Sequence, residues 1–346
     1  MDDELELEEN ENDEREYNPS YKLNSYGIDF DASGLVRRQE NGNIYLPDFQ
    51  RNYVWNNNQA SKFIESLLLG LPIPSICLYK EEDNKQIIID GFQRLHTIRR
   101  FYNKDFSLTN ISSPFVGKTI DDLNEDMRRK LDDTTIHATI VKADAPEERN
   151  YNAVYLIFER LNTGGVKLTP QEIRSCIYHG SFKDILNELA QDDNFIALLN
   201  ISPKRKKDQE IVLRLFALQE SFQDYTGNMK EFLNTYMEKH QKQNKESFSL
   251  EIELFKNTFS YLAFLEPMVF KPSKTLNLAI LDAIFVGTFR RIEKGEIKNL
   301  DAYKTVVKEM VVKDSFIQNI ETGKTHHTAP LKNRINIAIK EMEQLV

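Results

Sequence analysis

The sequence predicts an α+β fold, in which a mixed domain precedes a mostly helical one. Strand-like runs of β-branched and apolar residues occur only before about residue 145. From "PEERNYNAVYLIFERLN" onward the apolar spacing is almost entirely helical. A chain of 346 residues is long enough for two domains. We therefore expect an acidic tail at 1–20, a mixed domain at 21–145 and a helical domain at 146–346.

The acidic tail accounts for the net charge. Residues 1–16, "MDDELELEENENDERE", hold ten acidic residues and one arginine, which equals the whole formal charge of −9. The remaining chain has 44 acidic and 44 basic residues and is neutral. A dense acidic run without aromatic residues predicts a self-repelling, disordered segment. A nucleic-acid surface, if the protein has one, must then be a local basic patch.

The predicted elements follow in order along the mixed domain. "GNIYLPDFQRNYVW" (42–55) reads as a short strand, a proline and a polar-aromatic turn. A helix of about a dozen residues follows, and Gly70 and Pro72 end it. "SICLYKEEDNKQIIID" (75–90) predicts a hairpin, because two apolar runs flank a polar turn. A second helix begins at Phe92, and "HATIVKA" (137–143) predicts a further strand.

The junction between the hairpin and the second helix is the first candidate site. Asp90 ends a strand, Gly91 lacks a Cβ, and a helix with its dipole-positive end follows at once. Free backbone N–H groups at such an end suit an anion. Arg94 offers a fork of donors for phosphate oxygens, and Gln93 is placed to orient a water molecule. An ordinary Asp-Gly turn is the alternative interpretation.

Two further segments are candidates for the same chemistry. In "PDFQRNYVW", packing of the aromatic side chains does not explain why the polar residues are present. A glycine-rich loop at 162–165 can offer backbone N–H donors to a phosphate. The loop precedes a strong helix start, in which Thr169, Pro170 and Glu172 supply the cap, the first-turn proline and the capping box. A plain helix connector is the alternative for this loop. The candidate residues are Gln50, Arg51, Asn162, Thr163, Gly164 and Gly165.

A basic cluster in the helical domain is a weaker candidate. "KRKK", with Lys204, Arg205, Lys206 and Lys207, precedes an apolar helix and indicates either a DNA contact or solvated loop charge. The six histidines form no metal-binding pattern. Two cysteines define no disulfide framework, so we expect buried free thiols.

Together these segments resemble a known family. The order "LPDFQRNYVW", "IIIDGFQRLHTI" and "FERLNTGGVKLTPQEIR" is similar to the ParB/sulfiredoxin-like family called domain of unknown function 262, which includes the NTP-hydrolysing part of GmrSD-type restriction systems. The resemblance covers most of residues 21 to about 220. It implies a ParB-like domain that binds and hydrolyses ATP or GTP. The matching positions are Asp90, Gly91, Gln93, Arg94, Gln50, Arg51, Asn162, Thr163, Gly164 and Gly165.

Two departures from the family pattern matter. Phe92 stands where the family most often has glutamine, so turnover is expected to be slower or absent. No Asp-His or His-Asn pair is followed by a metal-binding helix, as an appended HNH nuclease domain would require. We therefore expect that any DNA cutting belongs to a separate nuclease subunit or to the ParB-like domain itself. A sulfiredoxin activity is not expected, because "GFQR" lacks the cysteine.

The sequence thus predicts a Mg²⁺-dependent nucleoside triphosphatase in a DNA restriction or anti-phage defence system. Asp90 is the expected metal ligand. The expected catalytic residues are Asp90, Gln93, Arg94 and Arg51, and Phe92 is expected to be part of the nucleotide site. The alternatives are a non-catalytic nucleotide- or DNA-binding regulator, and direct nicking of DNA by this chain. DNA and a nuclease subunit are expected partners, and a homo-oligomer is compatible with the sequence. No apolar run approaches the roughly 20 residues that span a membrane, and no signal peptide pattern is present, so we expect a cytoplasmic location.

Overall fold

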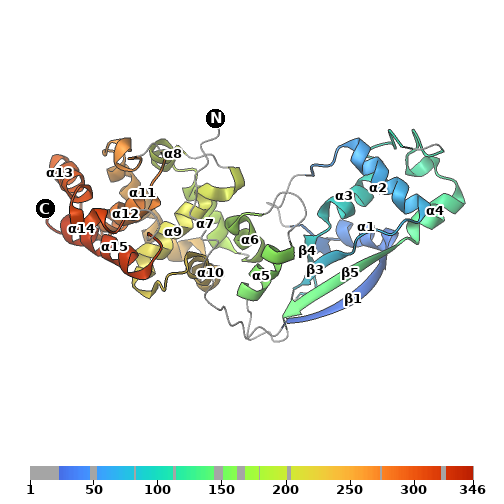
Figure 1. The fold of residues 1–346 in the computed structure, drawn as a ribbon, viewed down its shortest axis with the longest axis horizontal. Coiled ribbons are helices and arrows are strands. Elements are labelled where there is room, and N and C mark those ends of the chain that lie inside the picture. Colours follow the sequence, from blue (N-terminus) through green and yellow to red (C-terminus); the bar gives the residue numbers. More distant parts are fainter. Residues whose placement is uncertain are drawn as a thin grey trace. The chain divides into compact units, whose positions relative to one another are not determined.

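The computed structural model describes residues 23–46, 53–81, 83–111, 114–143, 151–161, 168–178, 180–200, 204–272, 275–320 and 325–345. The chain forms two compact units, Asn18–Leu168 and Thr169–Val346, which we call the N-terminal unit and the helical unit (Figure 1). The sequence-based boundary at 145/146 therefore differs from the division between compact units, which is at 168/169. The expected α+β class is confirmed, since all strands of the described residues precede residue 144.

The N-terminal unit is built on a five-stranded mixed sheet with the order β1-β5-β3-β4-β2. β1 and β5 pair antiparallel over nine residues, from Leu23 opposite Ala143 to Asp31 opposite Thr135. β3 runs parallel to β5 and antiparallel to β4, which confirms the expected hairpin. The elements are β1 (Leu23–Asp31), α1 (Ala32–Glu40), β2 (Ile44–Tyr45), α2 (Asn57–Leu69), β3 (Ile76–Lys80), β4 (Gln86–Asp90), α3 (Phe92–Tyr102), α4 (Glu125–Asp132), β5 (Thr135–Ala143) and α5 (Tyr151–Leu161).

Helices α1, α2 and α3 cover one face of this sheet (Figure 1). Alternation along β1 follows this arrangement, since Phe30 is buried beneath α1 whereas Asp29 on the opposite face is exposed. Leu35 of α1, Ile64 of α2 and Ile98 of α3 are fully buried in the same core cluster. The sheet and its helices thus hold the ends of β1 and β4 in fixed positions.

Local sequence signals set the helix ends of this unit. Asn56 and Gln59 form a reciprocal capping box at the start of α2, and Gly70 ends the helix in the left-handed conformation. α3 begins at Phe92, directly after β4, as expected. Both cysteines of the chain, Cys77 and Cys176, are buried free thiols, which also agrees with expectation.

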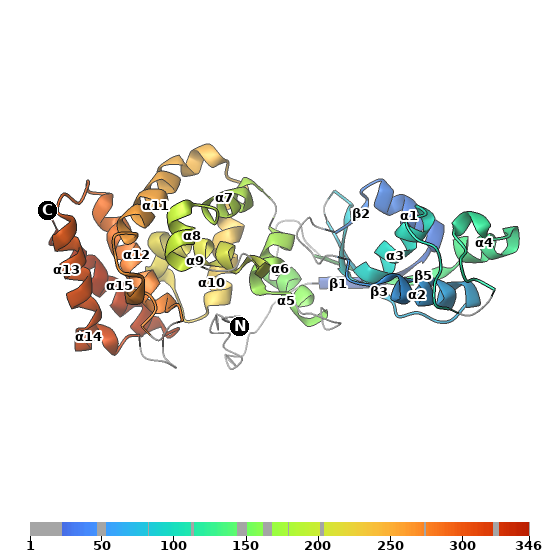
Figure 2. The same ribbon diagram turned by 90° about the horizontal axis from the view of Figure 1, so that it is seen from above.

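The helical unit packs around α12, which is buried along almost its whole length. α9, α11 and α15 contact it, and Figure 2 shows α11 and α15 on either side. Gly287 lets α12 and α15 approach closely, because a Cβ there would lie 3.0 Å from atoms of Ala338. The helices are α6 (Pro170–Ile177), α7 (Ser181–Leu189), α8 (Asp193–Leu199), α9 (Lys207–Ser221), α10 (Met229–His240), α11 (Ser249–Leu262), α12 (Leu278–Ile292), α13 (Leu300–Val311), α14 (Asp314–Ile317) and α15 (Thr328–Met342).

A buried ion triad joins three of these helices. Asp282 of α12 accepts two hydrogen bonds of 2.8 Å from Arg214 of α9 and one of 3.1 Å from Arg334 of α15. Asp282 and Arg334 are completely buried. Such a triad fixes how the helices pair, because breaking it would leave an uncompensated buried charge. None of the helices within the described ranges is long and apolar enough to cross a membrane.

Candidate functional site

The β4–α3 corner, Asp90–Arg94, is the site that the sequence singles out. Gly91 has a φ of +96°, a backbone conformation that residues other than glycine rarely adopt. A Cβ at this position would lie 2.5 Å from Cγ2 of Ile76. No side chain caps the N-terminus of α3. Glycine is therefore required here by both the backbone conformation and the neighbouring strand, and the dipole-positive end of α3 lies beside Asp90.

Arg94 and Asp90 form an ion pair across this corner. Nη2 of Arg94 lies 2.9 Å from Oδ2 of Asp90, and their side chains are 13% and 43% exposed. Nη1 donates to the carbonyl oxygens of Pro74 and Ser75, the latter at 3.1 Å. Burial lowers the pKa of Arg94, although the charge of Asp90 opposes this effect. Arg94 thus holds the carboxylate in place and fastens the loop before β3.

Gln93 connects the corner to the second predicted segment. Its Oε1 accepts hydrogen bonds from the backbone N–H groups of Val54 and Trp55, at 3.1 and 3.3 Å. The hydroxyl of Tyr53 lies 2.8 Å from Oγ1 of Thr97, one turn further along α3. The end of the "PDFQRNYVW" segment is therefore bound to α3, although the two motifs are about 40 residues apart.

An aromatic wall continues from this contact along α3. The ring of His96 lies 4.7 Å from that of Tyr53 and 5.2 Å from that of Phe92, measured between centroids. The guanidinium of Arg100 lies 4.6 Å from the centroid of the Tyr53 ring. Phe92 also packs partly against the core cluster of the unit. Burial lowers the pKa of His96, and the charges of Arg99 and Arg100 lower it further, so the ring is neutral at pH 7.

Tyr53, His96 and Arg100 were not among the residues predicted from the sequence. The i, i+4 spacing of Phe92 and His96 places both rings on one face of a helix, and this was the available signal. The contact with Tyr53 depends on the tertiary structure and left no signal in the sequence.

Cys77 lies beneath the corner, opposite Asp90 in the β3–β4 pairing and next to a register shift. Burial raises the pKa of its thiol to about 11, and the charge of Asp90 contributes. The thiol is therefore protonated at neutral pH, which makes it a packing group rather than a nucleophile.

Several predicted site residues lie outside the described residues, and their roles stay predictions. Of the upstream segment, the structure describes only the part from Tyr53 onward. The loop between α5 and α6 is also outside the described residues, but the helix start that follows it is confirmed, with Thr169 and Glu172 in a capping box and Pro170 in the first turn. The residues concerned are Gln50, Arg51, Asn162, Thr163, Gly164 and Gly165.

The basic cluster Lys204–Lys207 belongs to the helical unit, at the start of α9. Arg205 and Lys206 adopt left-handed conformations, with φ values of +63° and +58°. Arg205 lies 3.3 Å from Glu172, and Lys206 donates to Gln209 at 3.2 Å. Burial lowers the pKa of Lys206, and the charge of Lys183 adds to this effect. Arg205 thus contacts α6, and Lys206 contacts the first turn of α9, both within the helical unit.

The expected magnesium ion has one candidate ligand at the corner. Within the described ranges, no group of three or more His, Cys, Asp or Glu residues is placed to hold a metal ion. Mg²⁺ bound with a nucleotide usually takes one or two protein carboxylates, and phosphate oxygens and water complete its shell. The half-exposed carboxylate of Asp90 fits that requirement as a single ligand.

Comparison with known proteins shows that part of the chain is similar to one family. Residues 32–179 match the family model described as "GmrSD restriction endonuclease, N-terminal domain". The match includes the β4–α3 corner and supports a restriction-system family. An uncharacterized protein of Methanocaldococcus jannaschii is 29% identical over 106 residues, which cover 23% of this chain and 18% of that relative. The match thus spans about a fifth of the relative's length. No solved structure matches the chain.

Proposed function

We propose that the N-terminal unit binds ATP or GTP at the β4–α3 corner and hydrolyses it, as the ParB-like component of a restriction system. One observation carries the proposal. A half-exposed carboxylate, Asp90, is held by the guanidinium of Arg94 at an uncapped helix N-terminus whose glycine tolerates no side chain. Positive charge, backbone N–H groups and a metal-binding carboxylate are the groups that phosphoryl transfer requires.

Each group at the corner has a distinct proposed role. Arg94 adds positive charge beside the bound phosphates and orients Asp90, and the N-terminus of α3 binds a phosphate oxygen. Asp90 would be the protein ligand of Mg²⁺. When bound with the nucleotide, the ion would neutralise part of the phosphate charge. Gln93 positions the segment that continues into Arg51 and Gln50, through its contacts with Val54 and Trp55. Catalysis would then depend on positioning and electrostatics.

The restriction-system match supports two proposed partners. DNA is the proposed effector that changes the rate of hydrolysis, and a separate nuclease subunit is the proposed partner that cuts it. The basic cluster Lys204–Lys207 is proposed as a DNA contact, and a homo-oligomeric state is also proposed. A cytoplasmic location is likewise proposed.

The test compares Asp90→Asn with Asp105→Asn. Asp105 is a matched control because it lies just beyond the other end of α3, is 48% exposed and is 4.0 Å from Arg100. Asp90 is preferable to Arg94 as a target, because Arg94 also holds two backbone carbonyls. Phosphate release from ATP and GTP is measured with and without double-stranded DNA, together with the melting temperature.

We expect Asp90→Asn to lower hydrolysis by about 100-fold or more, as loss of a group that stabilises transition-state charge typically does. Asp105→Asn should retain the parent rate, and both variants should melt within a few degrees of the parent. Equal rates in parent and Asp90→Asn would contradict the proposal, as would a parent protein that releases no phosphate from either nucleotide under any of these conditions.

A non-catalytic nucleotide-binding regulator is the second candidate, and one observation favours it. The polar side chains of the corner make internal contacts, since Gln93 accepts from two backbone N–H groups and Arg94 donates to two backbone carbonyls. Such groups can hold a binding surface without taking part in turnover. Calorimetric titration of the parent with ATP and GTP separates the two candidates, because a regulator binds nucleotide but releases no phosphate.

A further inference from the structure

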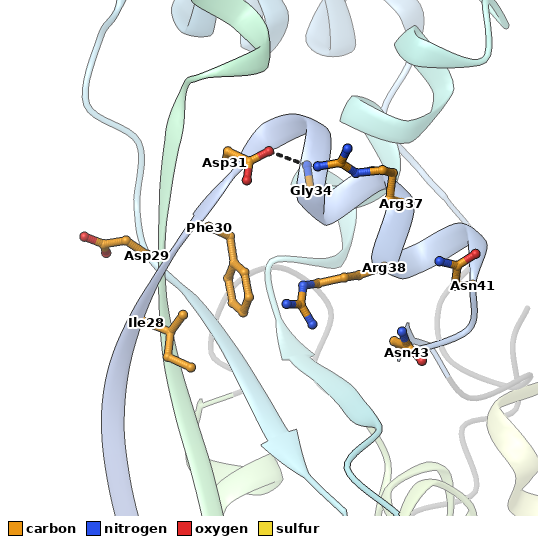
Figure 3. Close-up of a pocket in the computed structure, with 9 residues that line it drawn as sticks. All are labelled: Ile28, Asp29, Phe30, Asp31, Gly34, Arg37, Arg38, Asn41 and Asn43. Atoms are coloured by element: carbon orange, nitrogen blue, oxygen red, sulfur yellow. Dashed lines mark hydrogen bonds between the residues drawn. The ribbon is translucent and has the colours of Figure 1, made fainter.

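A polar hollow lies between the end of β1, helix α1 and the turn into β2, apart from the β4–α3 corner (Figure 3). Its volume is about 540 Å³, which falls in the range of small-molecule sites. Phe30 of β1 forms its apolar wall. Two adjacent arginines of α1, Arg37 and Arg38, and two asparagines after it, Asn41 and Asn43, supply its polar lining. No predicted site residue belongs to this hollow.

The two acidic residues of the hollow are engaged elsewhere. Oδ1 of Asp31 caps α1, accepting from the hydroxyl of Ser33 at 2.6 Å and from the N–H of Gly34. These hydrogen bonds, that of Ser33 first, lower the pKa of Asp31. Asp29 is paired with His137 on β5, and Figure 3 shows its side chain pointing away from α1. The carboxylates therefore serve the fold.

The arginines of the lining, by contrast, form no close ion pair among the described residues, although the charge of Arg37 makes a small contribution to the lowered pKa of Asp31. Arg37 and Arg38 are exposed and form no ion pair with any residue that the structure describes. Arg38 lies over the ring of Phe30, 5.2 Å from its centroid, so its guanidinium is held at the hollow by a cation–π contact. Arg94, Arg128 and Arg129 of the same unit each meet a carboxylate within 3.2 Å.

The asparagines complete the donor set. The side chains of Asn41 and Asn43 are exposed, and within the described ranges neither amide makes a hydrogen bond. Their backbones, however, are fixed, since the N–H of Asn43 donates to Arg38 and its carbonyl accepts from Gln86 of β4. Two guanidinium forks and two amides thus surround one hollow on a rigid backbone.

We propose that this hollow binds a phosphate group, carried by a free nucleotide or by a nucleic-acid backbone. Arginine forks match phosphate oxygens in bidentate geometry, and asparagine amides are frequent donors to phosphate and sugar oxygens. The proposal concerns a second site and does not rest on hydrolysis at the β4–α3 corner.

The test compares the double variant Arg37→Gln/Arg38→Gln with Arg128→Gln/Arg129→Gln. The control pair is also adjacent on a helix of the same unit and removes the same charge, but its arginines are paired with Asp132 and Glu125. The probes are a fluorescent 20-base-pair DNA duplex, followed by anisotropy between 50 and 200 mM salt, and ATP without Mg²⁺, followed by calorimetry. Circular dichroism verifies that all proteins are folded.

If the hollow binds a nucleic-acid backbone, we expect the affinity for the duplex to fall about tenfold or more in the Arg37/Arg38 variant. The slope of log affinity against log salt concentration should also become shallower by about 2, because each lost phosphate contact reduces it by about 0.9. If the hollow binds a free nucleotide, the Arg37/Arg38 variant should bind the duplex as the parent does, but it should bind one ATP fewer per protein chain. Either result supports the phosphate site and identifies its source.

Three results would overturn the proposal: no effect of the Arg37/Arg38 variant on either probe, an equal effect of the control pair, or no binding of either probe by the parent. Failure of the proposed hydrolysis gives a different pattern, because Asp90→Asn leaves Arg37 and Arg38 intact. If the protein does not hydrolyse nucleotide but still binds a probe through Arg37 and Arg38, the proposed hydrolysis fails and the second site stands.

Discussion

At the scale of single residues, Gly91 is a position at which the fold does not tolerate a side chain. Gly91→Ala adds a methyl group 2.5 Å from Ile76 and forces a φ of +96° on an L residue. We expect a loss of about 2–4 kcal/mol in the free energy of unfolding, since strain and overpacking add. Gly117→Ala is the control, because its φ is +79° but nothing lies within 4 Å of the added Cβ.

The control should lose only about 1 kcal/mol, the cost of a left-handed alanine. Urea denaturation of the parent and both variants gives the comparison. Equal losses in the two variants would show that contact with Ile76 contributes nothing, and that backbone conformation alone requires the glycine.

Phe92 is the second residue whose role the structure refines. It is half-buried, packs against the core and lies 5.2 Å from His96. Phe92→Gln should therefore lower stability by about 1 kcal/mol through lost apolar burial. It also places a polar side chain at the N-terminus of α3, and we expect a modest rise in the rate of nucleotide hydrolysis.

Phe92→Leu separates packing from polarity, because it stays apolar but loses the ring. Its hydrolysis rate should not rise. If Phe92→Gln and Phe92→Leu both weaken nucleotide binding to the same extent, the ring stacks on the base, a contact that is typically worth about 1–3 kcal/mol. Rates are measured by phosphate release and affinities by calorimetry.

At the scale of elements, the pairing of α9 with α10 should make stability depend on pH. Nε2 of His240 lies 3.3 Å from Oε2 of Glu220, and the hydroxyl of Tyr236 donates to the same oxygen at 2.8 Å. Contact with His240, assisted by Lys239 and Tyr236, lowers the pKa of Glu220 to about 2. A carboxyl with a lowered folded pKa stabilises the fold above its unfolded pKa and loses this contribution as the pH falls toward 2.

Glu220→Gln should therefore reduce stability by about 1 kcal/mol at pH 7, a value that allows for partial exposure, and the difference should shrink below about pH 4.5. Glu238→Gln on α10 is the control, since burial raises the pKa of Glu238 and the sign of the effect is reversed. That variant should be as stable as the parent at pH 7 or more so. Denaturation at pH 7, 5 and 3 measures both, and a pH-independent effect of Glu220→Gln would exclude the ionic contribution.

At the scale of the whole molecule, the acidic segment at 1–16 should be dispensable for folding. These residues lie outside the described residues, so the prediction rests on composition, since ten acidic groups in sixteen residues repel one another and bury little. Deleting residues 1–16 should leave the melting temperature within experimental scatter. A drop of many degrees on calorimetry would show that the segment binds to the folded protein.

The sequence by itself determined the features that depend on neighbouring residues. The turn chemistry of "EEDNK" and the β-branched run at 86–90 predicted the hairpin of β3 and β4. Gly70 and Thr169 marked a helix end and a helix start that the structure confirms. The α+β class followed from the same local patterns, because propensity, capping and apolar period act over a few residues. Asp90, Gly91 and Arg94 were recognised as a unit for this reason.

Only the tertiary structure decided which distant segments meet. β1, with Gly27 and Asp29 in its centre, carries a weak strand signal and is stabilised by nine pairings with β5, more than 100 residues later. The contact of Gln93 with Val54, the carbonyl partners of Arg94 and the hollow beside Arg38 likewise join residues that are separated in the sequence. Hydrophobic patterns specify that a face is buried but not which surface covers it, so these partners are fixed only when the whole sheet assembles.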